Sequence, residues 1–175
     1  MLRSAAAAAA LIAVSLVLTP AAAQQTEPRH IRTVAPEPWR PAGALHFLAL
    51  TPLDEGVFVD PDSIRRSDGR VEARMLTVGG QVRQVAEGDI RWTWTRVDVD
   101  CAGRAWETLE LDAYNTEGTW LAGFTGPVLG TNPVDVPSEE AVLAYLCDGA
   151  RPAGFQIAPD QAAAVAGIMR AFAGR

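Results

Sequence analysis

The segment from Asp89 to Tyr114 most strongly limits how this chain can fold. It holds two runs rich in valine, tryptophan, threonine and leucine, separated by the short polar break Ala102-Gly103. Such runs around a tight break are typical of a long β-hairpin. A two-residue turn there would give two cross-strand pairs, Val99 with Trp106 and Trp94 with Leu111. A longer turn would shift the register and move one strand's side chains to the other face.

The first residues have the features of an export signal. Arg3 gives a basic start, an uncharged apolar run extends to Leu18, and Ala21-Ala22-Ala23 is a small-residue cleavage pattern. We therefore predict a signal peptide over residues 1–23, cleaved after Ala23. An uncleaved anchor is the alternative, but the apolar run is short and rich in alanine. The mature protein is expected in the periplasm or at the cell surface, with no membrane insertion after cleavage.

The remaining chain divides into a leader and one domain. Residues 24–38 contain three prolines and no apolar periodicity, which predicts a flexible leader. A single domain is expected over residues 39–175, a length sufficient for one hydrophobic core.

Two cysteines, Cys101 and Cys147, are the only ones in the chain. In an exported protein such a pair most simply forms a disulfide. A redox or metal-binding pair is the alternative, but there is no Cys-x-x-Cys spacing and no histidine near either residue.

Two helices are predicted after the hairpin. Ser138 suits an N-cap and Gly149 suits the position after the end, so Cys147 would lie in the last turn of the first helix. Apolar residues three and four apart predict a second helix over residues 159–173. Further strands are expected at Leu45–Leu50, Val57–Val59, Val71–Met75 and Trp120–Phe124, with a turn at Asp60–Ser63 and a loop from Gly79 to Gly88. The predicted fold class is α+β: an antiparallel sheet of about five or six strands, a C-terminal helix joined to it by the disulfide, and a second short C-terminal helix.

The composition excludes several kinds of chemistry. The net charge is −6, which is unsuited to nucleic acid, and all fifteen basic residues are arginines. The only histidines are His30, in the leader, and His46, in an apolar strand where it is expected to be packed or hydrogen-bonded. A Ser-His-acid site therefore lacks a suitable base, and a zinc site lacks ligands once the cysteines are paired.

Two sets of acidic residues are candidates for chemistry: the first for calcium binding and the second for glycoside cleavage. Asp60, Asp62 and Asp68 lack the spacing of a calcium loop, so turn formation explains them better. The hairpin acids alternate with apolar residues and have Arg96 and Arg104 as cross-strand partners, which favours solvated faces over a glycosidase pair. No catalytic residue, cofactor or metal is predicted.

The tryptophans are the remaining candidates for a site. Trp is common both in cores and in binding faces. One face of the hairpin is expected to be covered by the helices, and the other is either covered as well or exposes aromatic surface to a partner. We therefore select Trp106 and Trp120 as the candidate binding surface.

Three motifs follow one another between Trp39 and Cys147. They are Phe58-Val59-Asp60 with Ser63-Ile64 and a turn at Gly69, then Cys101 with a strand ending at Tyr114 and a turn at Gly118, then Pro137-Ser138 before the helix with Cys147. In this order they resemble the surface-adhesin protein E family, small exported domains of Gram-negative bacteria. The resemblance implies an antiparallel sheet with a C-terminal helix fastened by a disulfide.

This chain departs from the family pattern at two places. Pro133 and Val134 stand where a tryptophan often precedes the Pro-Ser step, and the helix from Pro159 lies beyond the matched region. The best-known members bind host extracellular-matrix proteins, but their ligand-binding segment matches no residue here, so no binding residue carries over.

The resemblance and the missing catalytic groups predict a non-enzymatic exported binding module. Its expected partner is a protein, and a second copy of the chain is one candidate. The alternative is a periplasmic accessory or inhibitor protein that acts on an envelope enzyme.

Overall fold

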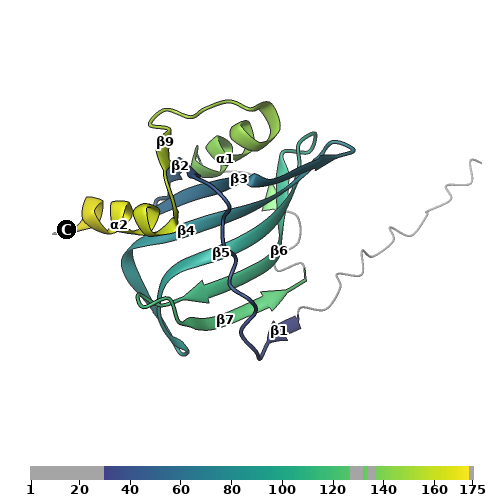
Figure 1. Cartoon of the computed structure of the whole chain (residues 1–175). Helices are drawn as coiled ribbons and strands as arrows, with labels where there is room; N and C mark the ends of the chain where they lie inside the picture. Colours follow the sequence, from purple (N-terminus) through teal and green to yellow (C-terminus); the bar gives the residue numbers. More distant parts are fainter. Residues whose placement is uncertain (1–29, 127–131, 134–136, 174–175) are drawn as a thin grey trace, which may run out of the picture.

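The computed structural model describes residues 30–126, 132–133 and 137–173 (Figure 1). The predicted signal peptide, residues 1–23, lies outside these ranges. The described elements are, in chain order, β1 (His30–Arg32), β2 (Leu45–Leu50), β3 (Glu55–Ser67), β4 (Arg70–Val85), β5 (Gly88–Asp100), β6 (Ala105–Tyr114), β7 (Trp120–Thr125), β8 (Asn132–Pro133), α1 (Pro137–Asp148), β9 (Gln156–Ala158) and α2 (Gln161–Phe172).

All nine strands of the described residues belong to one antiparallel sheet. Eight follow one another in the order β1-β7-β6-β5-β4-β3-β2-β9, and β8 pairs with β6 beside this path. The predicted number of five or six strands is therefore wrong. β1 and β9 have three residues each and β8 has two, which is too short for an alternating pattern to be recognised.

The central strands are longer than their sequence patterns indicated. β3 has 13 residues and β4 has 16. The predicted turn at Asp60 is an irregularity inside β3, where Asp60 Oδ1 accepts a hydrogen bond from the Asp62 amide at 3.0 Å. The predicted loop from Gly79 to Gly88 is instead the end of β4 and a two-residue turn into β5, because Val85 pairs with Gly88.

The central hairpin, β5 and β6, has the predicted register only near its turn. Val99 lies opposite Trp106, as predicted. The register then shifts by one residue at Leu109, whose carbonyl accepts a hydrogen bond from the Gly126 amide at 2.9 Å. Trp94 consequently lies opposite Asp112 instead of Leu111. A bulge of this kind inserts one residue without changing the composition of the strand.

The two predicted helices are confirmed, and they cover opposite faces of the sheet. α1 packs against β2 and α2 packs against β4 (Figure 1). Alternation along each strand separates the two cores. The α1 face buries a cluster that includes Val59, Val71, Ala73, Met75, Val97, Val99, Leu143 and Leu146. The α2 face buries a cluster that includes Phe58, Leu76, Val78, Trp92, Trp94, Tyr114, Ile168 and Phe172.

The predicted disulfide between Cys101 and Cys147 is confirmed. It joins residues 46 positions apart whose Cα atoms are 5.5 Å apart. The bond connects the turn after β5 to the last turn of α1, so it holds the helix at that end of the hairpin.

Part of the predicted flexible leader belongs to the sheet. β1 pairs with β7, and Arg32 donates to both carboxylate oxygens of Asp112 at 2.9 and 2.7 Å. Further along, Trp39 Nε1 donates to Oδ2 of the fully buried Asp60 at 3.0 Å. The prediction of a flexible leader is therefore wrong for residues 30–32. The backbone pairing of β1 with β7 and the charged hydrogen bonds of Arg32 offset the conformational entropy that these residues lose.

We expect removal of the disulfide to destabilise the fold strongly. Replacing Cys101 and Cys147 together with alanine should lower the free energy of unfolding by about 2–4 kcal/mol, because the open chain gains entropy. Urea unfolding of the oxidised protein and the double variant would measure this. Equal stabilities would contradict the anchoring role of the bond.

A second prediction concerns the close approach of α2 to the sheet. A Cβ at Gly80 would lie 2.6 Å from the ring of Phe172, so Gly80→Ala should lower the free energy of unfolding by about 1–3 kcal/mol. Gly167→Ala is the control on α2, because nothing lies within 4 Å of its added Cβ. This control should be neutral or stabilising by up to about 1 kcal/mol, since alanine favours helix. Equal losses in both variants would argue against the packing described.

Candidate functional site

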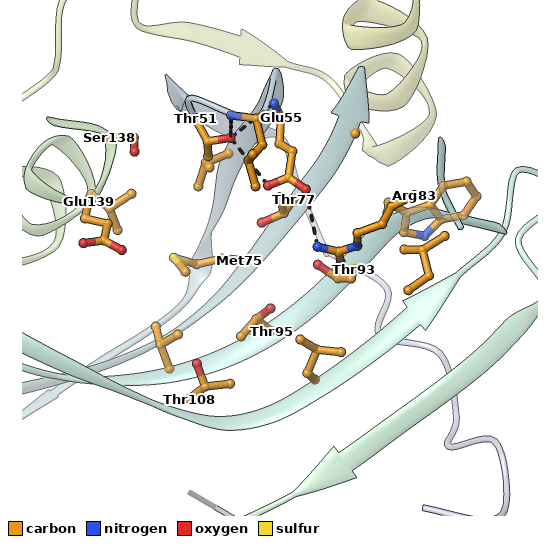
Figure 2. A pocket seen from close by; sticks show the side chains of 18 of the residues that line it. Thr51, Glu55, Met75, Thr77, Arg83, Thr93, Thr95, Thr108, Ser138 and Glu139 are labelled. Atoms are coloured by element: carbon orange, nitrogen blue, oxygen red, sulfur yellow. Dashed lines mark hydrogen bonds and ion pairs between the residues drawn. The ribbon is translucent and has the colours of Figure 1, made fainter. Parts of the chain in front are cut away.

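An open groove of about 600 Å³ lies beside α1 on the same face of the sheet (Figure 2). α1 covers only one end of this face, and the strands bend around the part that it leaves open. The floor comes from β4, β5 and β6: Met75, Thr77, Thr93, Thr95, Val97, Thr108 and Leu111. One wall is the start of α1, with Ser138, Glu139 and Val142, and another is the β2–β3 loop, with Thr51, Pro52 and Leu53.

Strand pairing explains why these residues form a continuous floor. Thr93 and Thr95 are two residues apart on β5, so both point to the same face as Val97. Thr77 lies directly opposite Thr93 on β4, and Thr108 lies opposite Val97 on β6. The floor therefore carries hydroxyl groups from three neighbouring strands.

The hydroxyl groups of this floor have no hydrogen-bond partner among the described residues. This holds for Thr77, Thr93, Thr95 and Thr108. Thr93 and Thr95 are only 7% and 9% exposed, although both line the groove. None of these hydroxyls is among the buried side-chain atoms of the described residues that lack a partner, so they face the open groove and can donate to or accept from a bound group.

The charged side chains of the groove lie around its rim and balance one another. Glu55 and Arg83 form an ion pair at 3.8 Å. Arg91 donates from Nη1 to the carbonyl oxygens of Gly79 and Gly80 at 3.1 and 3.3 Å. Glu139 adds a second carboxylate on the α1 wall. Two carboxylates and two guanidinium groups give a neutral rim around an uncharged floor.

Exposed apolar side chains continue the groove outwards at the β2–β3 loop. Leu53 lines the groove and is 73% exposed, and the nearby Leu50 is 51% exposed. Leu53 therefore adds exposed apolar surface to the rim of the groove.

The two tryptophans selected from the sequence lie on opposite faces of the sheet. Trp106 packs on the α1-face core and lines the groove. Trp120 packs on the α2-face core, and its Nε1 donates to Asp112 Oδ1 at 3.0 Å. They cannot form one surface, because the bulge at Leu109 reverses the alternation along β6 between Trp106 and Tyr114. A role in binding stays a prediction for each of them.

The α2 face carries a network of paired charges where α2 does not cover it. Glu110 forms ion pairs with Arg32, Arg74 and Arg96 at 3.7, 3.2 and 2.9 Å. Arg74 also lies 4.4 Å above the ring of Trp39. The prediction that Arg96 neutralises hairpin acids is confirmed. Arg104 instead reaches α1, where it pairs with Glu140 and with Asp148.

His46 links β2 to α1, as a packed strand residue. Its Nδ1 is hydrogen-bonded to the Tyr145 hydroxyl at 2.5 Å, and the ring lies edge-on to Phe155 with centroids 5.1 Å apart. Burial lowers the pKa of His46 below its usual 6.5, and the charge of Arg151 lowers it further. Burial also raises the pKa of Tyr145.

The described residues contain neither a metal-binding cluster nor a membrane-spanning helix. No three His, Cys, Asp or Glu side chains in these ranges lie close enough together to hold a metal ion. None of the helices in the described part of the chain is long and apolar enough to cross a membrane. The carboxylate of Asp60 accepts hydrogen bonds from Trp39 and from the Asp62 amide, so it has a structural role at the irregularity in β3.

The chain matches the model of a known protein family. A family model described as surface-adhesin protein E matches residues 48–148. The match includes both cysteines and every residue that lines the groove, whereas β1 and α2 lie outside it. No curated protein matches the chain.

We expect His46 to make the fold less stable in mild acid. Because its pKa in the folded protein lies below 6.5, the unfolded chain takes up the proton first as the pH falls. The stability contributed by neutral His46 is present above pH 6.5 and is lost as the pH falls through the folded pKa. Urea unfolding between pH 7.5 and 5 should show a smaller loss for His46→Gln than for the wild type.

Tyr145→Phe is the control for this measurement. It removes the hydrogen bond to Nδ1 and keeps the histidine, so a pH-dependent loss should persist. An unchanged pH dependence in His46→Gln would contradict the assignment to His46.

Proposed function

The chain belongs to the surface-adhesin protein E family, and from this we propose that it is an exported, non-enzymatic binding module of the cell envelope, located in the periplasm or at the cell surface. The observation that carries the proposal is the groove beside α1. It lies wholly inside the region that matches the family. Its volume of about 600 Å³ falls within the range usual for ligand sites.

The groove and its rim suit a protein partner. Protein interfaces depend on a few apolar or aromatic anchors in desolvated pockets, surrounded by polar contacts. Here the exposed Leu53 would contact the partner first, and the pocket between α1 and the floor would receive one of its segments. The half-buried Trp106 lines the same groove and offers an aromatic surface near the disulfide.

The side chains of the groove support binding more than catalysis. General acid–base or nucleophilic chemistry needs a base within hydrogen-bond reach of its target or nucleophile. Among the groove residues, Glu55 is paired with Arg83, and the hydroxyl groups belong to threonines and Ser138 with no histidine among them. His46 is engaged with Tyr145.

A periplasmic accessory or inhibitor protein is the second candidate, and the β4–β5 hairpin favours it. Residues 83–87 at its tip are all exposed, including Val85 at 38%. An exposed tip of this kind could enter the active site of an envelope enzyme. Inhibition of an endogenous enzyme by the purified protein, lost in Val85→Asp, would favour this function.

The test of the proposed function is affinity capture with the oxidised mature protein, followed by identification of the retained proteins. We expect Leu53→Asp to weaken binding of the retained partner at least tenfold, because a charge would be desolvated at the contact. Val34→Asp is the matched control: Val34 is 77% exposed, close to the 73% of Leu53, and does not line the groove. Retention of no protein, or equal weakening by both variants, would contradict the proposal.

A further inference from the structure

The chemistry of the groove indicates what kind of segment it would receive. Its floor combines apolar side chains with threonine hydroxyls that have no partner among the described residues. We propose that the groove binds an uncharged, extended peptide segment of the partner protein. This inference rests on the proposed function, and it names the chemistry of the ligand at the same site.

The balance of charge argues for an uncharged segment. The floor contains no ionisable side chain, and the two carboxylates at the rim are matched by two guanidinium groups. Arg83 is paired with Glu55, and Arg91 is held by two backbone carbonyls. A charged side chain placed over the floor would lose hydration and find no counter-ion on the floor itself.

The unpartnered hydroxyls argue for an extended segment over a helix. A helix satisfies its own backbone hydrogen bonds, so its side chains alone would meet the floor. An extended segment brings free N–H and C=O groups, which must find partners when they leave water. A threonine hydroxyl can donate to a carbonyl and accept from an amide, so the floor of the groove meets both needs.

The spacing of the hydroxyls agrees with an extended backbone. Thr93 and Thr95 lie two residues apart on β5, which places them roughly 6.6–6.8 Å from one another along the strand. A peptide running along β5 repeats its backbone groups at the same interval. Thr77 lies one strand away, about 4.8 Å in the perpendicular direction.

The side chains between the hydroxyls determine what the segment would carry. Met75 lies opposite Thr95 on one side and Leu111 lies opposite it on the other. Val97 follows along β5, and Val142 of α1 forms the adjacent wall. A segment along β5 that turns its backbone groups to these hydroxyls directs its alternate side chains sideways, over β4 and over β6. Residues over β6 would meet Leu111 and be apolar, and residues over β4 would meet Thr77 and be small and polar.

The probe for this inference is a capped hexapeptide of alternating valine and serine. Titrated into isotope-labelled, oxidised protein, it should shift the amide resonances of Thr93, Thr95 and Leu111. Versions with aspartate or lysine in place of serine should bind at least tenfold more weakly. A version with N-methylated amides should also bind about tenfold more weakly, because it loses its backbone donors.

Variants of the protein test the hydroxyls directly. Thr93→Val with Thr95→Val keeps the shape of both side chains and removes both hydroxyls, so peptide binding should weaken about tenfold or more. Thr125→Val is the matched control, because Thr125 is a strand threonine paired with Glu110, on the opposite face. The spectrum of each variant reports whether the fold is retained.

Several outcomes would overturn the inference. These are no binding of any of the peptides, equal binding of charged and uncharged peptides, unchanged binding in the double threonine variant, or preferred binding of a helical alanine-based peptide. Threonine-dependent binding of a neutral oligosaccharide in preference to the hexapeptide would overturn it as well.

If the captured partner still depends on Leu53 but not on the threonines, the inference fails and the binding module stands. If no partner is captured, the proposed function itself fails.

Discussion

The disulfide between Cys101 and Cys147 determines which part of the α1 face is covered. It holds the last turn of α1 against the turn between β5 and β6, where Leu143 and Leu146 join the core around Val99. Arg104, in the same turn, pairs with two acids of α1 and reinforces the attachment. Because α1 has only 12 residues, a helix fixed at this end cannot cover the whole face. The groove is the part of the face that remains.

The two faces of the sheet carry different kinds of polar side chain. On the α2 face, carboxylates and guanidinium groups pair directly, as Glu110 and Arg96 do, although Nε of Arg96 is buried without a partner among the described residues. On the α1 face the polar groups of the floor are uncharged hydroxyls, and the structure leaves them without internal partners. A hydroxyl that faces an open groove can exchange its hydrogen bonds with water for hydrogen bonds with a ligand, without breaking an ion pair. This contrast supports the proposal that a partner binds on the α1 face.

Local patterns in the sequence predicted the central hairpin, both helices and the disulfide, because each depends on neighbouring residues or on a unique cysteine pair. The short strand β1 depends on pairing with β7, and the bulge at Leu109 leaves no compositional trace, so both were missed. Because of this bulge, Trp106 and Trp120 lie on opposite faces of the sheet, which their positions in the sequence did not show. The groove did leave one signal, since Thr93 and Thr95 alternate with tryptophans, whereas Asp98 and Asp100 further along β5 alternate with valines. A strand stretch without a charged face must be covered on both sides or must line a cavity, but only the assembled sheet shows which.

α2 lies outside the region that matches the family, and in this chain it packs against β4. Gly56 and Gly80, which lack a Cβ, allow Ile168 and Phe172 to approach the strands closely. The contact buries Trp94, whose Nε1 donates to Gln161 at 3.1 Å. Without α2, the indole rings of Trp92 and Trp94 would form an aromatic patch on that face and compete with the groove for partners. By covering these two rings, α2 leaves the groove beside α1 as the proposed binding surface, where uncharged polar groups and apolar side chains face the solvent.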